Sequence, residues 1–162
     1  MTDKYLVLAD LTGQDFSQRD LSGWNLGHTT IDGCKFGNCL GTNFVMTHGF
    51  NIDFTAADIT DTTFEKADQS VLNCLVGATW NSVKVTHVSE WFNVTEPFTC
   101  FATNAFVQVG CKQRTMEDFE RIGKDAESIK ELLNDHPDLD VSSVLNWWKE
   151  NAETVRKWYR SI

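Results

Sequence analysis

Large apolar residues fall at every fifth position through the first part of the chain. The uninterrupted series consists of Leu6, Leu11, Phe16, Leu21, Leu26, Ile31 and Phe36. A period of five matches neither the strand period of two nor the helix period of 3.6. A short fixed repeat is typical of a solenoid, in which each unit buries its apolar side only against its neighbours. The pattern therefore predicts a solenoid rather than one wide globular core.

The segment 9–13 contains one complete repeat unit. Its order is a small residue, an acid, a large apolar residue and two polar or small residues, in the sequence ADLTG. This pattern resembles the pentapeptide repeat family. The resemblance implies a mainly β fold, a right-handed quadrilateral β-helix of about four coils, capped by an aromatic-rich segment and two or three C-terminal α-helices. We place the β-helix at residues 1–88, and the capping segment and helices at residues 89–162.

Four repeats per turn assign the apolar residues to columns. The three strong columns are Leu6, Leu26, Phe44 and Phe64; Phe16, Phe36, Phe54 and Cys74; and Leu21, Leu40, Ile59 and Trp80. The fourth column weakens at Gly49, where Phe50 is the alternative inward residue. Gln14, Arg19 and Trp24 stand where the repeat has small residues, so we expect the second turn to be open, bulged or covered.

The segment after residue 88 is rich in aromatic residues and then becomes helical in pattern. Trp91, Phe92, Phe98, Phe101 and Phe106 predict a plug over the last coil, with an exposed binding patch as the alternative. An N-cap at residue 115 and acids in the following turn predict the start of a helix.

A last helix is predicted from about Val141 to Arg160 by apolar residues at helical spacing. Trp148 lies on this apolar face, and Trp147 and Trp158 make the face wider than one neighbour needs. Two interpretations stay open: packing on the rest of the chain, or the interface of a homodimer, since several members of the resembling family join through a C-terminal helical element.

The charge and the cysteines restrict the class of function. The net charge is −9, from 23 acids against 14 Lys and Arg. This balance favours cationic partners and argues against direct binding of nucleic acid, although simple solubility explains it equally well. The chain shows no apolar run long enough to span a membrane and no leader, so we expect no membrane association. The five cysteines lack a CxxC pair, and we interpret them as reduced thiols of a cytoplasmic protein.

The sequence contains no recognisable catalytic or metal-binding motif. Its four histidines share no ligand spacing, and no phosphate-binding loop or nucleophile motif occurs. We therefore expect no enzyme activity, no catalytic residue, no metal and no cofactor.

The resemblance supplies a functional hypothesis instead. Some pentapeptide repeat proteins mimic B-form DNA and occupy the DNA channel of a type II topoisomerase, and virus-encoded members block nucleic-acid-handling defence enzymes. By this resemblance we expect a non-enzymatic DNA-mimic inhibitor that binds the basic DNA-recognition groove of a CRISPR or restriction defence complex, or of a type II topoisomerase. The alternative is a structural scaffold that recruits a partner or self-associates through its Trp-rich helix. The candidate partner-binding acids are Asp10, Asp15, Asp20, Asp53, Asp58, Asp68, Glu117, Asp118, Glu120, Asp125, Glu127 and Glu131.

Overall fold

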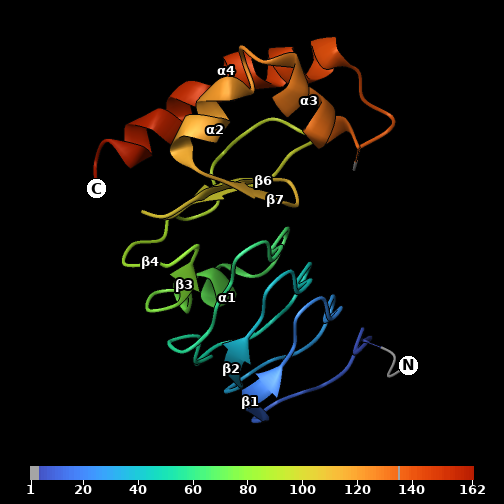
Figure 1. The fold of residues 1–162 in the computed structure, drawn as a ribbon, viewed down its shortest axis with the longest axis vertical. Helices are drawn as coiled ribbons and strands as arrows, with labels where there is room; N and C mark the ends of the chain where they lie inside the picture. The colour runs from blue at the N-terminus through green and yellow to red at the C-terminus, as the bar shows by residue number, and fades with distance from the viewer. Residues whose placement is uncertain (1–3, 135) are drawn as a thin grey trace.

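The computed structural model describes residues 4–134 and 136–162 (Figure 1). Three parts follow one another along the longest axis: the turns of the N-terminal half, a small antiparallel sheet, and a group of helices. The described chain begins at one end of the molecule, and its helices lie at the other. The sheet therefore separates the N-terminal half from the helices.

The N-terminal half, residues 4–88, is built of successive turns that pair in parallel; we call it the N-terminal stack. Single bridges join residues 18 to 21 positions apart, as in Asp10 to Thr30 and Thr30 to His48. The backbone N–H of Leu11 donates to the carbonyl of Thr30 at 2.8 Å, and that of Ile31 donates to the carbonyl of His48 at 2.9 Å. Each turn thus hydrogen-bonds to the next one.

Regular elements within the stack are few and short. Strands β1 (Asp15–Asp20) and β2 (Lys35–Asn38) pair in parallel. Helix α1 (Gln69–Asn73) follows, and strands β3 (Thr79–Trp80) and β4 (Val83–Lys84) form an antiparallel pair.

The predicted fold class, a mainly β chain forming a right-handed quadrilateral β-helix of about four coils, is wrong. The strands are two to six residues long and lie in sheets of two or three strands, and about 24% of the chain is helical. The described residues form no closed or solenoid sheet. The five-residue period itself explains this result, because a turn follows nearly every bridge. At Gly13 and Gly33, for example, φ is +73° and +63°, which ends the extended backbone.

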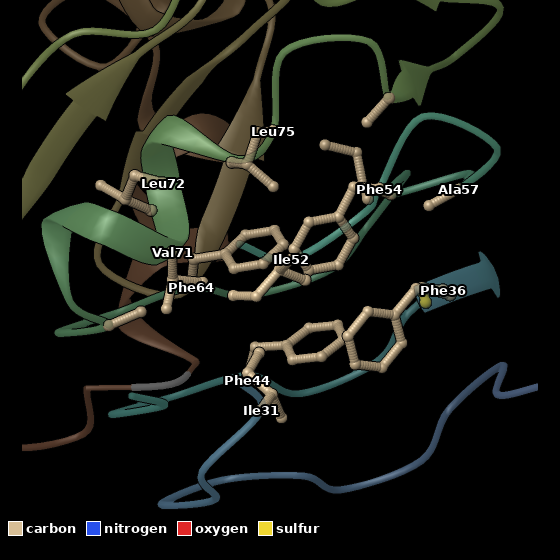
Figure 2. Close-up of a cluster of buried hydrophobic side chains, with 14 of the residues drawn as sticks. Ile31, Phe36, Phe44, Ile52, Phe54, Ala57, Phe64, Val71, Leu72 and Leu75 are labelled. Atoms are coloured by element: carbon tan, nitrogen blue, oxygen red, sulfur yellow. The ribbon is translucent and has the colours of Figure 1, made fainter. Parts of the chain in front are cut away.

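Two interleaved rows of phenylalanine rings lie within the core of the stack (Figure 2). Phe36 stacks on Phe54 with ring centroids 4.9 Å apart, and Phe44 stacks on Phe64 at 5.2 Å. Rings of different rows meet edge to face at 5.3 to 6.0 Å. Burial of each such side chain contributes about 1.5–3 kcal/mol, and each favourable ring pair adds about 0.5–1.5 kcal/mol. Packing of these rings therefore stabilises the turns of the stack, which contain few strand hydrogen bonds.

Two inward positions differ from the prediction. Cys39 rather than Leu40 is buried in the core that contains Leu21 and Ile59, and Leu40 is 43% exposed. The N–H of Cys39 donates to the carbonyl of Asp58, so the inward residue comes one position earlier than the repeat count gives. The alternative prediction, that Phe50 points inward, is also wrong, because Phe50 is 58% exposed.

Two of the large residues at small-residue sites contact the core of the stack. The guanidinium of Arg19 lies over the ring of Phe16, 5.8 Å from its centroid, and Trp24 packs on the same cluster. The pairing of β1 with β2 is irregular between Phe16 and Asp20, so the backbone bulges at this point.

The small sheet and the helices form the second half. Strands β5 (Cys100–Ala102), β6 (Val107–Val109) and β7 (Lys112–Arg114) pair in antiparallel order. Helices α2 (Met116–Arg121), α3 (Ala126–Leu133) and α4 (Val141–Tyr159) follow. The predicted N-cap is confirmed, since the Thr115 hydroxyl accepts a hydrogen bond from the N–H of Asp118 at 3.0 Å.

The sheet contributes to two separate cores because strand side chains alternate between its faces. Phe101 packs with the stack, whereas its neighbours Cys100 and Ala102 pack with the helices. The predicted plug divides in the same way. Trp91, Phe101 and Phe106 contact the core of the stack, and Phe92 and Phe98 contact the core of the helices.

Candidate functional site

The aspartates of the stack are anchored at their turns. Five of them use Oδ1 to accept a hydrogen bond from the backbone N–H two residues later, at 2.9 to 3.0 Å; they are Asp10, Asp15, Asp20, Asp53 and Asp58. This is the local turn that Asp side chains favour. At Asp10 and Asp53 a threonine hydroxyl donates to the same oxygen at 2.6 and 2.7 Å. Each carboxylate is therefore held in one orientation.

Hydrogen bonding also keeps these groups ionised. The pKa of Asp10, Asp15, Asp20 and Asp53 is lowered first by the hydroxyl side chain two residues later and then by the backbone N–H of the same residue. Donors to a carboxylate stabilise its charged form. These four sites therefore keep their negative charge at pH values where ordinary carboxyl groups begin to protonate.

The anchored acids alternate with other residues from turn to turn. Lys35 is bridged to both Asp15 and Asp53, and its Nζ lies 3.9 Å from Oδ2 of Asp15. In the same way Asn38 lies between Asp20 and Asp58. Two acids of one column are thus two turns apart, about 10 Å at the usual strand spacing. The carboxylates form a sparse array and not a continuous row.

Further acids of the candidate set are paired within the chain. In the stack, Oδ1 of Asp68 lies 3.2 Å from Nδ1 of His48. The paired helical acids, with their basic partners, are Asp118 with Arg121, Glu120 with Arg156, Glu127 with Lys130, and Glu131 with Arg114. Asp125 is the N-cap of α3, and Glu117 is exposed on α2. The helical acids therefore present less uncompensated charge than their density in the sequence indicates.

The three tryptophans of α4 contact their own chain. Trp147 is 3% exposed, and its indole N–H donates to the carbonyl of Thr95 at 2.8 Å. The N–H of Trp148 donates to the carbonyl of Phe119 at 3.1 Å. Trp158 meets the ring of Phe92 at 6.2 Å. These contacts favour the packing interpretation of the wide apolar face, and the homodimer stays a prediction.

Side chains with metal-binding or nucleophilic chemistry are scattered in the described ranges. No three His, Cys, Asp or Glu residues of 4–134 and 136–162 come together as metal ligands. Burial raises the pKa of Cys39 to about 12, with smaller contributions from Asp20 and Asp58, and burial also raises the pKa of Cys100. These thiols are therefore poor nucleophiles. Among the described helices, none is both long and apolar enough to cross a bilayer.

Sequence reasoning missed a polar cleft between the stack and helices α2 and α3. Its volume is about 630 Å³, and its lining includes Trp80, Gln113 and Arg114. Four of the candidate acids also line it: Asp118, Asp125, Glu127 and Glu131. No sequence signal indicated the cleft, because its walls come from segments that are distant along the chain.

Comparisons with known proteins give no relative. No family model matches the chain, and neither the curated proteins nor the solved structures contain a significant match to it.

Proposed function

We propose that the protein is a non-enzymatic acidic inhibitor that acts in the cytoplasm. Its partner is the basic DNA-recognition groove of a DNA-handling protein, either a CRISPR or restriction defence complex or a type II topoisomerase. The observation that supports this most is the set of anchored, ionised carboxylates on the stack, at Asp10, Asp15, Asp20 and Asp53. The pattern resemblance to pentapeptide repeat proteins is the second support.

The physical basis is replacement of phosphates by fixed carboxylates. A basic groove gains affinity when its Lys and Arg side chains are neutralised by an anionic surface, and the interaction weakens as salt rises. Carboxylates that are already oriented lose less conformational freedom on binding than mobile side chains do. B-form DNA carries about one charge per 1.7 Å of axis, so the sparse array here fits a groove contacted at a few points.

The test uses a purified CRISPR effector complex and a purified type II topoisomerase, each with its own DNA as competitor. We expect the protein to bind one of them, to be displaced by that DNA, and to lose affinity as salt is raised. Binding that is indifferent to both DNA and salt would contradict the proposal, as would an absence of binding to basic DNA grooves.

Charge-neutralising variants distinguish the contribution of the anchored acids to binding from the contribution of the total net charge. The test variant replaces four acids with the isosteric amide, which keeps the Oδ1 acceptor of each turn: Asp10→Asn, Asp15→Asn, Asp20→Asn and Asp53→Asn. The control removes the same charge from exposed positions elsewhere: Glu90→Gln, Glu96→Gln, Asp138→Asn and Glu150→Gln. We expect the first variant to lose most of the affinity and the second to keep it. Equal losses would mean that only total charge matters.

A further inference from the structure

The cleft is lined by a buried arginine that has hydrogen-bond partners for only some of its donors. Arg114, at the end of β7, lines the cleft and is 6% exposed. Its Nη1 donates to Oε2 of Glu131 at 2.9 Å. Its Nε and Nη2 are also buried, and neither has a hydrogen-bond partner in the described part of the chain. Buried donors are nearly always paired, so this edge of the guanidinium is suited to an acceptor.

Arg156 shows what the same edge binds elsewhere in this protein. Its Nε and Nη2 donate to the two carboxylate oxygens of Glu120, at 2.7 and 2.6 Å. A guanidinium matches a planar carboxylate in this two-bond arrangement. Arg114 has the same pair of nitrogens without a partner, and it lines a cleft of about 630 Å³, which is within the size range of small-molecule sites.

The other charges of the cleft restrict the ligand further. The lining contains three basic and five acidic side chains, for a net charge of −2. A simple anion placed beside Glu131 would be repelled by this surplus. A carboxylate that belongs to a cationic molecule avoids the repulsion, because its ammonium groups pair with the surrounding acids.

We propose that the cleft binds the carboxylate of a basic zwitterion, either a basic amino acid or the C-terminal residue of a basic peptide. The carboxylate is held by Nε and Nη2 of Arg114, and the ammonium groups lie among the lining acids Asp118, Asp125 and Glu127. Because both nitrogens are closed to solvent, lining side chains shift as the ligand enters. Arg121 and Lys130 line the cleft with side chains that are 57% and 67% exposed, and each is held by an i,i+3 ion pair of the weak surface kind.

The test is nitrogen-15 NMR of the full chain, following the arginine Nε–H resonances, each assigned by through-bond correlation to its own backbone amide. The probes are L-lysine, acetate, butylamine, and trilysine with either a free or an amidated C-terminus. We expect L-lysine and free trilysine to shift the Arg114 resonance, and acetate, butylamine and amidated trilysine to bind about tenfold more weakly or not at all. Tighter binding of free trilysine than of L-lysine identifies a peptide terminus, and the reverse identifies an amino acid.

Two variants with opposite expected effects complete the test. Arg114→Lys keeps the charge but lacks the two-nitrogen edge, so we expect affinity for L-lysine to fall about tenfold. Glu131→Gln removes a negative charge beside Arg114 that repels the carboxylate of the ligand, so we expect affinity to rise. Arg160→Lys, on an exposed side chain, should change nothing.

The Glu131→Gln variant keeps the proposal testable if Arg114→Lys does not fold. An unmoved Arg114 resonance, equal binding of free and amidated trilysine, or no gain in Glu131→Gln would overturn the proposal. None of these readouts involves a DNA-binding partner, so the outcome is independent of the inhibitor function.

Discussion

Gln108 of β6 accepts a hydrogen bond from the backbone N–H of Phe64 at 3.2 Å, so a side chain of the small sheet pairs with the backbone of the N-terminal stack. Its Nε2 also donates to the carbonyl of Gly110 at 2.9 Å. Gln108 is completely buried. A second glutamine, Gln113, accepts from the indole of Trp80 at 2.7 Å and donates to the hydroxyl of Thr62 at 3.0 Å. Polar side chains thus connect the stack to the sheet with specific geometry.

Replacing Gln108 with leucine should destabilise the protein markedly. The variant leaves the N–H of Phe64 and the carbonyl of Gly110 buried without these partners, at a cost of about 1–3 kcal/mol for each group. We expect the urea midpoint to fall by an amount that corresponds to about 2 kcal/mol or more, with an unchanged slope. Gln18→Leu, at an exposed position, should stay within about 0.5 kcal/mol of the wild type. Similar effects of the two variants would contradict a structural role for Gln108.

The phenylalanine rows predict a sharp contrast between two neighbouring positions. Phe54 is fully buried and stacks on Phe36, whereas Phe50 is 58% exposed. Phe54→Ala should cost about 3–5 kcal/mol through lost burial and the cavity that remains, and Phe50→Ala should cost less than about 0.5 kcal/mol. Chemical denaturation measures both values. A large effect at Phe50 would mean that this ring packs inside, as the repeat count allowed.

How much of the fold the sequence predicts depends on the range of the interactions involved. The five-residue spacing correctly places Phe36, Phe44, Phe54 and Phe64 inside, because that spacing is set by local turns. It misplaces Leu40, since the inward position is decided by pairing of Cys39 with Asp58, nineteen residues away. The predicted β-helix is wrong because the period gives the spacing of bridges and not the length of strands.

The candidate site shows the same limit. Local chemistry is partly predictable: Thr115 caps a helix as the sequence predicts. A Ser or Thr two residues after an Asp is not sufficient to anchor the carboxylate, since Asp53 is anchored in this way and Asp68 is not. The cleft and the unpaired donors of Arg114 cannot be predicted from the sequence, because they arise where β7, α2, α3 and the stack meet. The sequence leaves Trp147 to either packing or an interface, and its burial and its hydrogen bond to Thr95 favour packing.

The anchored acids make a direct prediction about titration. The hydroxyl of Thr55 is the first cause of the lowered pKa of Asp53, and the backbone N–H of the same residue is the second. Thr55→Val removes the hydroxyl and keeps the backbone donor, so the pKa of Asp53 should rise toward its ordinary value. Thr55→Ser keeps both donors, so the Asp53 carboxyl of this variant should titrate as it does in the wild type. Carbon-13 NMR of the Asp53 carboxyl measures the change, and an unshifted titration in Thr55→Val would refute this cause.

The ion pair of Glu120 with Arg156 predicts a pH dependence of stability. The Arg156 hydrogen bond lowers the pKa of Glu120 from its ordinary 4.5, so the folded state binds this proton less readily than the unfolded state. The stabilisation is therefore fully present above pH 4.5 and is lost as pH falls through the lowered pKa. Glu120→Gln should cost about 1 kcal/mol at pH 7 and much less near pH 3. Urea unfolding at the two pH values tests this, with Glu117→Gln as the control, and a pH-independent difference would contradict it.

A strained corner of the stack provides the last prediction. Leu8 has φ of +63° and is 77% exposed, so its side chain gains little from packing while its backbone lies in the left-handed region. This conformation costs a residue with a Cβ about 1–2 kcal/mol, and glycine adopts it freely. Glycine also gains freedom in the unfolded chain, so the expected net stabilisation of Leu8→Gly is about 0.5–1 kcal/mol. Leu40→Gly is the matched control, because Leu40 is also exposed but lacks a positive φ. This substitution should destabilise the protein by a similar amount. Thermal and urea unfolding of both variants measure the difference, and a loss of stability in Leu8→Gly would show that the exposed leucine makes a contact whose loss outweighs the relief of strain.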